Sequence, residues 1–457
     1  MRVLFTTFAA RSHLYAQVPL AWALRAAGHD VRIASQPDLA DDITRTGLTA
    51  VPVGEPLNQA EDAAVVDDRA WDRTEAEANP YAVDMATWPE LLDIAETAPQ
   101  RLTPEHTQGV FAAYAPLLFR YFSWQMTDDL VRYARDWRPD LVLWDPLTFA
   151  GPVAALAGGA AHARMLFGLD LVGWMRGHHL AAQAGRPAPL RDDPMSEWLG
   201  WTLAEYGLDF TEEAVTGQWT IDPVPGSLAL PTGGLRVPMR YVPYNGPSVV
   251  PSWVHEPPAR PRVCVTLGVS QQEVFGRDRA SVAEIIAAVA ALDVEVVATL
   301  NAAQVAALGA PLPTNVRVVD FVPLDALLPS CAAVISHGGA GTFQTALAHG
   351  VPQILVPDMI WDTARKAQRL EAAGAGLRIT DVDRFSAAEL RALLARVLDE
   401  PSFAHRAARL RDEMMAAPAP SDLVPTLERL TALHRPPRHG RQVSERPPST
   451  GTTTPLA

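Results

Sequence analysis

The strongest constraint on the fold is an alternation of short apolar runs with helical patterns that occurs twice along the chain. In the first half, the runs that predict strands are RVLFTTF (2–8), DVRIAS (30–35), LTAVPV (48–53), DLVLWD (140–145) and ARMLFG (163–168). In the second half, they are RVCVTLG (262–268), VEVVATL (294–300), VRVVDFV (316–322), AAVISH (332–337) and QILVPD (353–358). Such strands, separated by helices, are typical of parallel sheets that are covered on both faces. The sequence therefore predicts an α/β protein with two doubly wound, Rossmann-like domains.

The length of the chain and one Pro-rich stretch indicate where these domains end. The chain has 457 residues, and a single hydrophobic core rarely grows beyond about 300. YVPYNGPSVVPSW and EPPARP separate the two halves, and this composition favours an extended linker. We expect an N-terminal domain over 1–235, a linker over 236–260 and a C-terminal domain over 261–435. Residues 436–457 lack apolar periodicity and are interpreted as a disordered tail.

Charge and hydropathy exclude several classes of partner. The formal net charge of −14 disfavours nucleic acid or an anionic membrane as a partner. Polar residues interrupt the apolar start MRVLFTTFAA, no signal-peptide cleavage site follows, and no run reaches the ~18 apolar residues of a membrane span. We therefore expect a cytoplasmic protein. Its two cysteines, Cys264 and Cys331, lie in strand-like runs and are interpreted as buried free thiols.

A glycine-rich turn, HGGAGT (337–342), follows one predicted strand and precedes the helical pattern FQTALAHG. Glycine lets a backbone approach a ligand closely, and the first amides of a helix can bind a phosphate. The turn is not a dinucleotide fingerprint, because Gln344 stands where the third glycine would be, and it has no P-loop lysine. On these residues alone, a phosphate site and a purely structural turn both remain open.

The wider sequence around this turn resembles a known family. The order FVPLDALLPSCAAVISHGGAGTFQTALAHGVPQILVPDMIWDTARKAQRLEAAGAGLRI (321–379) is similar to the nucleotide-sugar signature of GT-B glycosyltransferases. RPDLVLWDP, TGQWTIDP and PRVCVTLGVS extend the likeness over nearly all of 1–434. The chain resembles actinomycete enzymes of antibiotic biosynthesis that attach TDP-deoxysugars to macrolide and anthracycline polyketides, of the desosaminyl- and rhodosaminyl-transferase type.

This resemblance implies a GT-B fold, in which two Rossmann-like domains face each other across a cleft. It also implies inverting transfer of the sugar to a hydroxyl, with no metal and no cofactor, the TDP-sugar being a co-substrate. The implied partners are a TDP-deoxysugar, a polyketide aglycone and a P450-like activator that docks on the N-terminal domain. A homodimer is left open.

The resemblance places the donor against the C-terminal domain. The implied donor-binding residues are Ser270, Phe321, Val322, His337, Gly338, Gly339, Gly341, Thr342, Asp362 and Thr363. Many relatives that use fully hydroxylated sugars have Asp-Gln where this chain has Asp362-Thr363, and loss of the long amide suits a deoxysugar. The Asp381–Asp383 string leads into a helix-capping pattern and is interpreted as a solvated turn rather than a metal site.

Two residues are candidates for the chemistry itself. His13 follows the first predicted strand and Asp145 ends the fourth, at the edge where parallel α/β domains bind ligands. The resemblance implies that His13 is a general base and that Asp145 orients it. A helix predicted over Val18–Gly28, with Pro19 near its start, leaves His13 in a loop. An inert loop histidine and an aspartate that only caps the turn DPLTFAGP are the alternatives.

Two other functions fit the same fold: a nucleotide-sugar epimerase and a non-catalytic subunit that binds a sugar nucleotide. The long aromatic-bearing region 67–137 favours an acceptor site, which an epimerase would not need. The joint presence of His13, Asp145 and His337 favours an enzyme over a non-catalytic subunit. Hydride transfer is disfavoured, because the dinucleotide fingerprint is absent.

Overall fold

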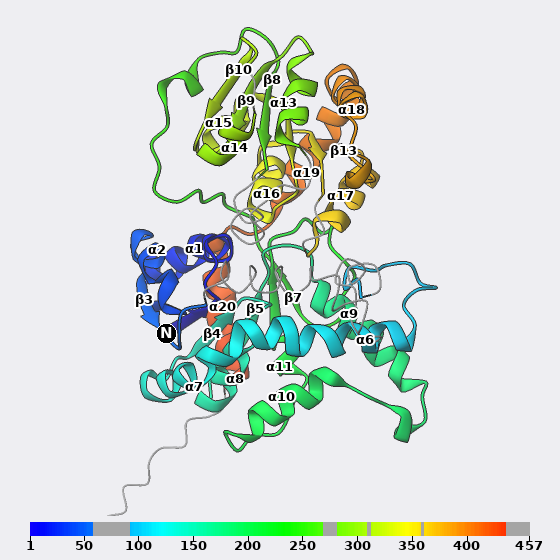
Figure 1. The fold of residues 1–457 in the computed structure, drawn as a ribbon. Helices are drawn as coiled ribbons and strands as arrows, with labels where there is room; N and C mark the ends of the chain where they lie inside the picture. The colour runs from blue at the N-terminus through cyan, green and yellow to red at the C-terminus, as the bar shows by residue number, and fades with distance from the viewer. Residues whose placement is uncertain (58–91, 268–280, 309–311, 358–360, 436–457) are drawn as a thin grey trace, which may run out of the picture.

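The structure is a computed structural model that describes residues 1–57, 92–267, 281–308, 312–357 and 361–435. These residues form two α/β domains, which lie one above the other in Figure 1. All strand pairs in their two sheets are parallel within the described residues. The predicted α/β class with two doubly wound domains is confirmed. Ser270, the first part of region 67–137 (up to residue 91) and the tail 436–457 lie outside the described residues.

The N-terminal sheet has the strand order β3-β2-β1-β4-β5-β6-β7. Its strands are β1 (Arg2–Thr6), β2 (Asp30–Ser35), β3 (Thr49–Pro52), β4 (Leu141–Trp144), β5 (Ala161–Met165), β6 (Trp219–Asp222) and β7 (Arg236–Pro238). The order changes direction between β1 and β4, and doubly wound sheets bind ligands at the carboxyl ends of strands beside such a switch point. His13 and Asp145 follow these two strands.

The C-terminal sheet has the order β10-β9-β8-β11-β12-β13. Its strands are β8 (Arg262–Thr266), β9 (Glu295–Thr299), β10 (Val316–Val319), β11 (Cys331–Ser336), β12 (Gln353–Leu355) and β13 (Gly376–Arg378). Here the switch point lies between β8 and β11, and the HGGAGT turn follows β11. The two sheets therefore repeat one arrangement, with a candidate site residue after a central strand of each.

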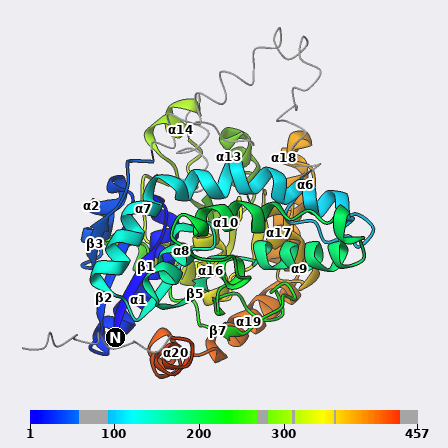
Figure 2. The same cartoon turned by 90° about the horizontal axis from the view of Figure 1, so that it is seen from below.

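Helices pack on the sheets of both domains. In the first half of the chain they are α1 (Arg11–Ala26), α2 (Ala40–Arg45), α6 (Pro104–Tyr114), α7 (Arg120–Trp137), α8 (Ala150–Gly158), α9 (Leu171–Ala184), α10 (Pro194–Ala204) and α11 (Glu213–Thr216). In the second half they are α13 (Val282–Ala290), α14 (Ala302–Ala307), α15 (Leu324–Leu327), α16 (Ala340–His349), α17 (Thr363–Ala372), α18 (Ala387–Asp399), α19 (Pro401–Ala416) and α20 (Pro420–His434). Seen from below, α6, α7 and α10 cross the end of the N-terminal domain that faces away from the C-terminal domain (Figure 2).

The apolar strands are continuous runs because both faces of each sheet are buried. In β1, Val3 and Phe5 pack in one cluster with residues of α1 and α20, whereas Leu4 packs in another with residues of α7 and α8. Successive side chains of a strand point to opposite faces, so each face needs its own apolar partners. This arrangement explains why the strands lack the polar alternation of a one-sided sheet.

Helix α1 differs from the prediction, which began the first helix at Val18. It begins at Arg11, so that Pro19 lies inside it and His13 lies in its first turn rather than in a loop. Pro19 costs the helix one hydrogen bond and about 3 kcal/mol. Burial of Leu14, Val18 and Leu24, at about 2 kcal/mol each, outweighs that cost.

The expected domain limits also differ from the structure at two points. The limit set at 235 falls immediately before β7, which pairs with β6 in the N-terminal sheet. Helix α20, which was placed in the C-terminal domain, packs on α1 and β5 instead, and it lies with the N-terminal domain in Figure 1. Its apolar face explains this position, because Leu423, Val424 and Leu427 are buried against the N-terminal sheet.

Candidate active site

His13 and Asp145, 132 residues apart in sequence, form a hydrogen-bonded pair. His13 Nδ1 lies 2.6 Å from Asp145 Oδ2, with the imidazole 13% and the carboxylate 2% exposed. A carboxylate oxygen accepts, so Nδ1 carries the hydrogen and Nε2 is the ring nitrogen that can take up a proton. The structure thus brings together the two residues that the sequence analysis selected for the chemistry.

The backbone around Asp145 explains how the carboxylate is held. Its amide donates to Thr6 O, 2.9 Å away, which ties the end of β4 to the end of β1. Its second oxygen, Oδ1, accepts the amide of Leu147 at 2.9 Å. The turn-capping role and the contact with His13 were alternatives on the sequence, and the structure shows both, one on each oxygen.

Two phenyl rings flank the imidazole of His13. The Phe8 ring lies 4.5 Å from it and the Phe167 ring 4.2 Å, both between ring centroids. Phe8 comes from the segment between β1 and α1, and Phe167 from the segment after β5. Neither ring could be predicted from the sequence, because no local pattern relates a phenylalanine after β5 to a histidine in α1.

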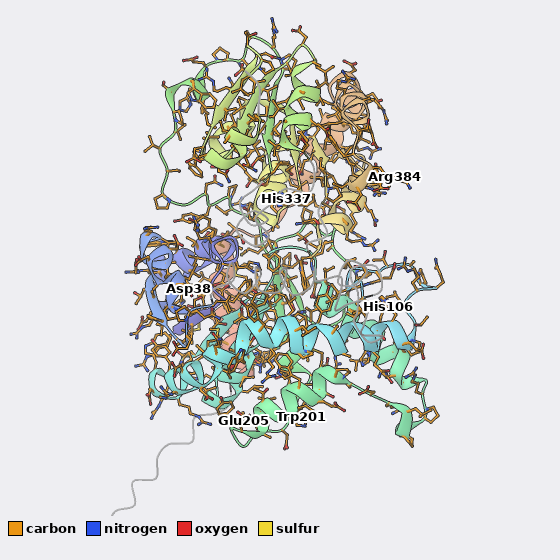
Figure 3. All side chains as sticks on the ribbon, in the orientation of Figure 1. Asp38, His106, Trp201, Glu205, His337 and Arg384 are labelled. Atoms are coloured by element: carbon orange, nitrogen blue, oxygen red, sulfur yellow. The ribbon has the colours of Figure 1, made fainter. Side chains whose placement is uncertain are left out.

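The glycine-rich turn has the geometry that a phosphate site needs. Gly338 has φ +88°, a conformation that favours glycine, and Gly339 is the N-cap of the ten-residue helix α16. A Cβ on Gly339 would lie 2.7 Å from His337 Nε2, so a side chain there would displace the imidazole of His337. The first amides of a helix have no partner within the helix, and its dipole favours an anion at that end. His337 lies on the side of the C-terminal domain that faces the N-terminal domain (Figure 3).

The other predicted donor-binding residues differ in accessibility. Phe321 is 53% exposed, whereas Val322 is buried in the cluster that contains Cys264 and Leu327. Any contact of Val322 with a base therefore has to come from its main chain. Gly341 and Thr342 lie in the first turn of α16.

Asp362 and Thr363 lie at the start of α17, and both are buried. Asp362 Oδ1 forms an ion pair with Lys366 Nζ at 2.9 Å. Its Oδ2 accepts the amide of Leu169, in the N-terminal domain, at 2.9 Å. This aspartate therefore contacts the opposite domain, which the sequence analysis did not foresee.

A second contact between the domains comes from Gln344, which donates through Nε2 to Phe167 O at 2.8 Å. Gln344 occupies the position where a dinucleotide fingerprint would have glycine, and a glycine could not make this bond. A long amide among the apolar neighbours of α16 was the one sequence signal for such a contact.

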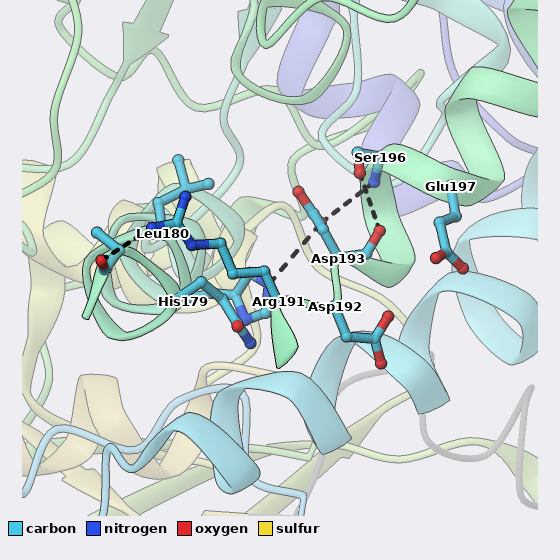
Figure 4. A pocket seen from close by; sticks show the side chains of 9 residues that line it. His179, Leu180, Arg191, Asp192, Asp193, Ser196 and Glu197 are labelled. Atoms are coloured by element: carbon cyan, nitrogen blue, oxygen red, sulfur yellow. Dashed lines mark hydrogen bonds and ion pairs between the residues drawn. The ribbon is translucent and has the colours of Figure 1, made fainter. Parts of the chain in front are cut away.

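A cavity away from this site lies in the N-terminal domain, between α9 and α10 (Figure 4). Its charged lining is largely paired within the protein: Asp193 accepts from Arg176 at 2.6 Å and 2.7 Å and caps α10 through Ser196. The cavity takes no part in the site around His13.

The string Asp381–Asp383 forms a capped turn, as predicted. Asp381 accepts the amides of Asp383 and Arg384, and Ser386 then accepts the amide of Glu389 at the start of α18.

Among the residues that the structure describes, no group of three His, Cys, Asp or Glu side chains is placed to hold a metal ion. No helix in the same residues is long and apolar enough to cross a membrane.

Comparison with known proteins decides the family. Models of the erythromycin biosynthesis protein CIII-like N-terminal and C-terminal domains match residues 22–268 and 283–430. The chain belongs to this family. The aclacinomycin-T 2-deoxy-L-fucose transferase of Streptomyces galilaeus is 58% identical, over 96% of this chain and 98% of the relative. The tylactone mycaminosyltransferase of Streptomyces fradiae is 49% identical, over 95% and 93%.

A solved structure of the glycosyltransferase VinC in complex with dTDP has the same fold. Its TM-score is 0.82, with 44% identity over 95% of this chain and all of VinC. The predicted GT-B fold and glycosyltransferase activity are confirmed by the family match and these relatives. The family assignment therefore favours sugar transfer over an epimerase or a non-catalytic subunit.

Proposed function

We propose that this glycosyltransferase moves a deoxysugar from a TDP-deoxysugar to a hydroxyl of a polyketide aglycone in antibiotic biosynthesis. The observation that carries the proposal is the His13–Asp145 pair, which follows strands β1 and β4 and lies beside Phe167, whose carbonyl oxygen accepts from Gln344 of helix α16. The names of the relatives support the substrate classes: one transfers 2-deoxy-L-fucose, another is a mycaminosyltransferase, and VinC binds dTDP.

The C-terminal domain would hold the donor. Gly338 and Gly339, which precede α16, and Gly341 and Thr342, in its first turn, would offer main-chain amides to the diphosphate. His337, adjacent to this turn, would add a hydrogen bond to a phosphate oxygen. The exposed ring of Phe321 and the main chain of Val322 would flank the base, and Ser270 would complete the diphosphate contacts. No metal ion is required if these groups offset the charge on the leaving diphosphate.

The N-terminal domain would supply the base. The acceptor oxygen attacks the anomeric carbon, while the bond from that carbon to the diphosphate oxygen breaks and its electron pair leaves with TDP. The acceptor proton passes to Nε2 of His13, and Asp145 stabilises the imidazolium that forms. A single displacement of this kind inverts the anomeric configuration.

The start of α17 supports a deoxygenated sugar. Both carboxylate oxygens of Asp362 already have protein partners, Lys366 and the amide of Leu169. Thr363 is buried and has no long amide to offer a ring hydroxyl. A TDP-6-deoxysugar, including an aminosugar, therefore fits better than UDP-glucose. Competition binding of TDP against UDP tests this choice, and a clear preference for UDP would contradict it.

Incubation of the purified chain with a TDP-deoxysugar, with and without a polyketide aglycone, tests the function. We expect TDP release that depends on the aglycone, and a glycoside of inverted configuration by NMR. An epimerised TDP-sugar without aglycone would indicate the epimerase instead. A chain that binds TDP but releases none under any condition would indicate the non-catalytic subunit.

We also propose that a P450-like activator protein raises the rate by docking on the N-terminal domain. Trp124 and Leu117, in the described part of region 67–137, are each 57% exposed and offer apolar contact area. Turnover should rise when a P450-like activator protein is added. Full turnover by the chain alone, unchanged by the activator, would contradict this proposal.

A further inference from the structure

The segment Phe167–Leu169, which follows β5, lies between the His13 imidazole and the C-terminal domain. The Phe167 ring contacts the imidazole, with 4.2 Å between centroids. The main chain of the same segment is bonded to the other domain at two points: Gln344 Nε2 donates to Phe167 O, and Leu169 N donates to Asp362 Oδ2. One three-residue segment therefore joins the candidate base to the candidate donor domain.

We propose that Phe167 is a positioning residue for His13, and that it takes up its position only when Gln344 and Asp362 of the C-terminal domain hold its backbone. The proposal deepens the proposed function and rests on it, since it assigns how the base becomes competent. Phe167 acts through His13 and is not itself given a chemical role.

The two rings beside His13 are anchored differently, which is the reason for this assignment. Phe8 is held within the N-terminal domain: its amide donates to Thr148 Oγ1 at 2.9 Å and its ring stacks on Phe122 at 4.1 Å. For Phe167, the residue before it is tied to the N-terminal sheet, since Leu166 N donates to Ile221 O at 2.9 Å, but its own carbonyl oxygen is bonded to the C-terminal domain. Within the described residues, the hydrogen bond to Asp145 fixes the imidazole at Nδ1, and the two rings that flank it fix the tilt of its plane. One of these rings is fixed, and the other depends on contact between the domains.

The segment Phe167–Leu169 is tightly packed against the C-terminal domain at Gly168. A Cβ on Gly168 would lie 2.3 Å from Asp362 Oδ2, so Asp362 approaches the backbone as closely as glycine allows. Lys366, itself buried, holds the other oxygen of Asp362. Small displacements of the C-terminal domain are therefore transmitted to the segment.

The anchors also belong to the elements that would bind the donor. Gln344 lies one turn into α16, whose first residues are the last three of HGGAGT, and Asp362 is the N-cap of α17. A donor that orders the start of these helices would also fix Phe167. Binding of the donor and alignment of the base would then be coupled through the protein, without contact between the donor and His13.

The test compares Phe167→Leu, Phe167→Tyr and Gln344→Ala with a matched control, Gln353→Ala. Gln353 is an equally buried amide of the C-terminal domain, but it donates to Phe343 O within its own domain. Phe167→Leu should lower kcat about 10- to 100-fold, because misplacement of a reacting group by about 1 Å costs up to that much. Affinity for TDP should stay at the wild-type value, and Phe167→Tyr, which keeps the ring, should retain most of kcat.

NMR of His13, assigned by the loss of its ring-proton signals in His13→Ala, supplies a readout that needs no substrate. Gln344→Ala should shift these signals in the same direction as Phe167→Leu, and Gln353→Ala should leave them in place. In the double variant Phe167→Leu with Gln344→Ala, kcat should be no lower than in the worse single variant.

Three results would overturn the proposal. One is a rise in the KM of the acceptor at unchanged kcat in Phe167→Leu, since the ring would then only line the acceptor site. The second is His13 signals that do not respond to Gln344→Ala, and the third is independent, multiplying losses in the double variant. If the wild-type chain transfers no sugar, the proposed function fails, whereas the NMR arm still reports whether the domains are coupled through Phe167.

Discussion

Asp145 contacts His13 through Oδ2, 2.6 Å from Nδ1, while its Oδ1 accepts the main-chain amide of Leu147. Replacing His13 by Ala should lower kcat by about 10²–10⁴, the usual loss when a general base is removed. Asp145→Asn should lose less. Because the two side chains act as one unit, the double variant should be no slower than His13→Ala. Steady-state kinetics with an alcohol acceptor, together with TDP binding, measure these effects.

Asp222 provides the control for Asp145. It also ends a strand of the N-terminal sheet and accepts an amide two residues later, from Val224 at 2.8 Å, but its second oxygen bonds Arg236 instead of a histidine. Asp222→Asn should affect stability and leave kcat of the folded enzyme near wild type. Near wild-type turnover by His13→Ala would place the base elsewhere.

Gly168→Ala should reduce kcat at least tenfold, because the new methyl group would overlap Asp362 Oδ2 and push the segment away from the C-terminal domain. Gly177→Ala in α9 is the matched control, since a Cβ there meets no atom within 4 Å. Kinetics and thermal unfolding of both variants test the effect. Unchanged turnover in Gly168→Ala would show that the domain contact at this point is dispensable.

The ion pair between Arg164 and Asp170 is predicted to be a major contribution to stability of the N-terminal domain. Arg164 Nη1 and Nη2 each donate to one Asp170 oxygen at 2.8 Å, and Asp170 also caps α9. Arg164 is 1% exposed, so Arg164→Met leaves a buried carboxylate without its partner and should cost about 3–5 kcal/mol in the free energy of unfolding.

Denaturant unfolding measures that loss, with Arg396→Met as the control. Arg396 pairs with Glu400 at 3.0 Å on the surface, and exposed pairs of this kind contribute about 0–1 kcal/mol. Equal losses in the two variants would contradict the prediction. Arg164→Lys should also destabilise the protein, because lysine cannot donate to both oxygens in parallel.

His162 should make the protein less stable in acid. Burial, aided by the charge of the nearby His434, lowers the pKa of His162 from 6.5 to about 3. Below pH 6.5 the unfolded chain takes up a proton at this position that the folded chain does not. The free energy of unfolding should therefore fall by up to about 1.4 kcal/mol per pH unit as the pH drops from about 6.5 towards about 3.

Chemical unfolding of His162→Leu across this range tests the acid effect. The His162→Leu variant should lose the fall in stability between about pH 6.5 and about pH 3 that His162 causes. His405 is exposed, so the control variant His405→Gln should keep this pH dependence. Identical pH profiles for wild type and His162→Leu would contradict the assignment.

The strand framework could be predicted because it depends on local sequence, whereas the pairing of His13 with Asp145 was implied by the family resemblance. Continuous apolar runs located most strands, and the ends of β1 and β4 placed His13 and Asp145 at one sheet edge. Strands β6, β7 and β13 were not predicted, because none of them lies in a continuous apolar run, whereas the equally short β12 lies in the run QILV. The early start of α1 was missed because Pro19 is a poor residue for a helix interior, and only tertiary burial offsets its cost.

The contacts between the domains could not be predicted for a different reason. The long amide of Gln344 signals a polar contact, but nothing in the sequence indicates that Gln344 meets Phe167 or that Asp362 meets Leu169, since 177 and 193 residues separate these bonded partners. Their association depends on how two complete domains dock. A single sequence carries the folding pattern of each domain but little information on their mutual orientation.

The return of helix α20 to the N-terminal domain means that the polypeptide passes between the domains twice. One connection precedes β8 and the other follows α19, where Arg240 N bonds Pro418 O at 2.8 Å. A chimaera that exchanges the donor half between relatives therefore needs two junctions, one on each connection. A single crossover would pair α1 with a foreign α20, across an interface where His29 Nε2 lies 3.1 Å from Glu428 Oε1.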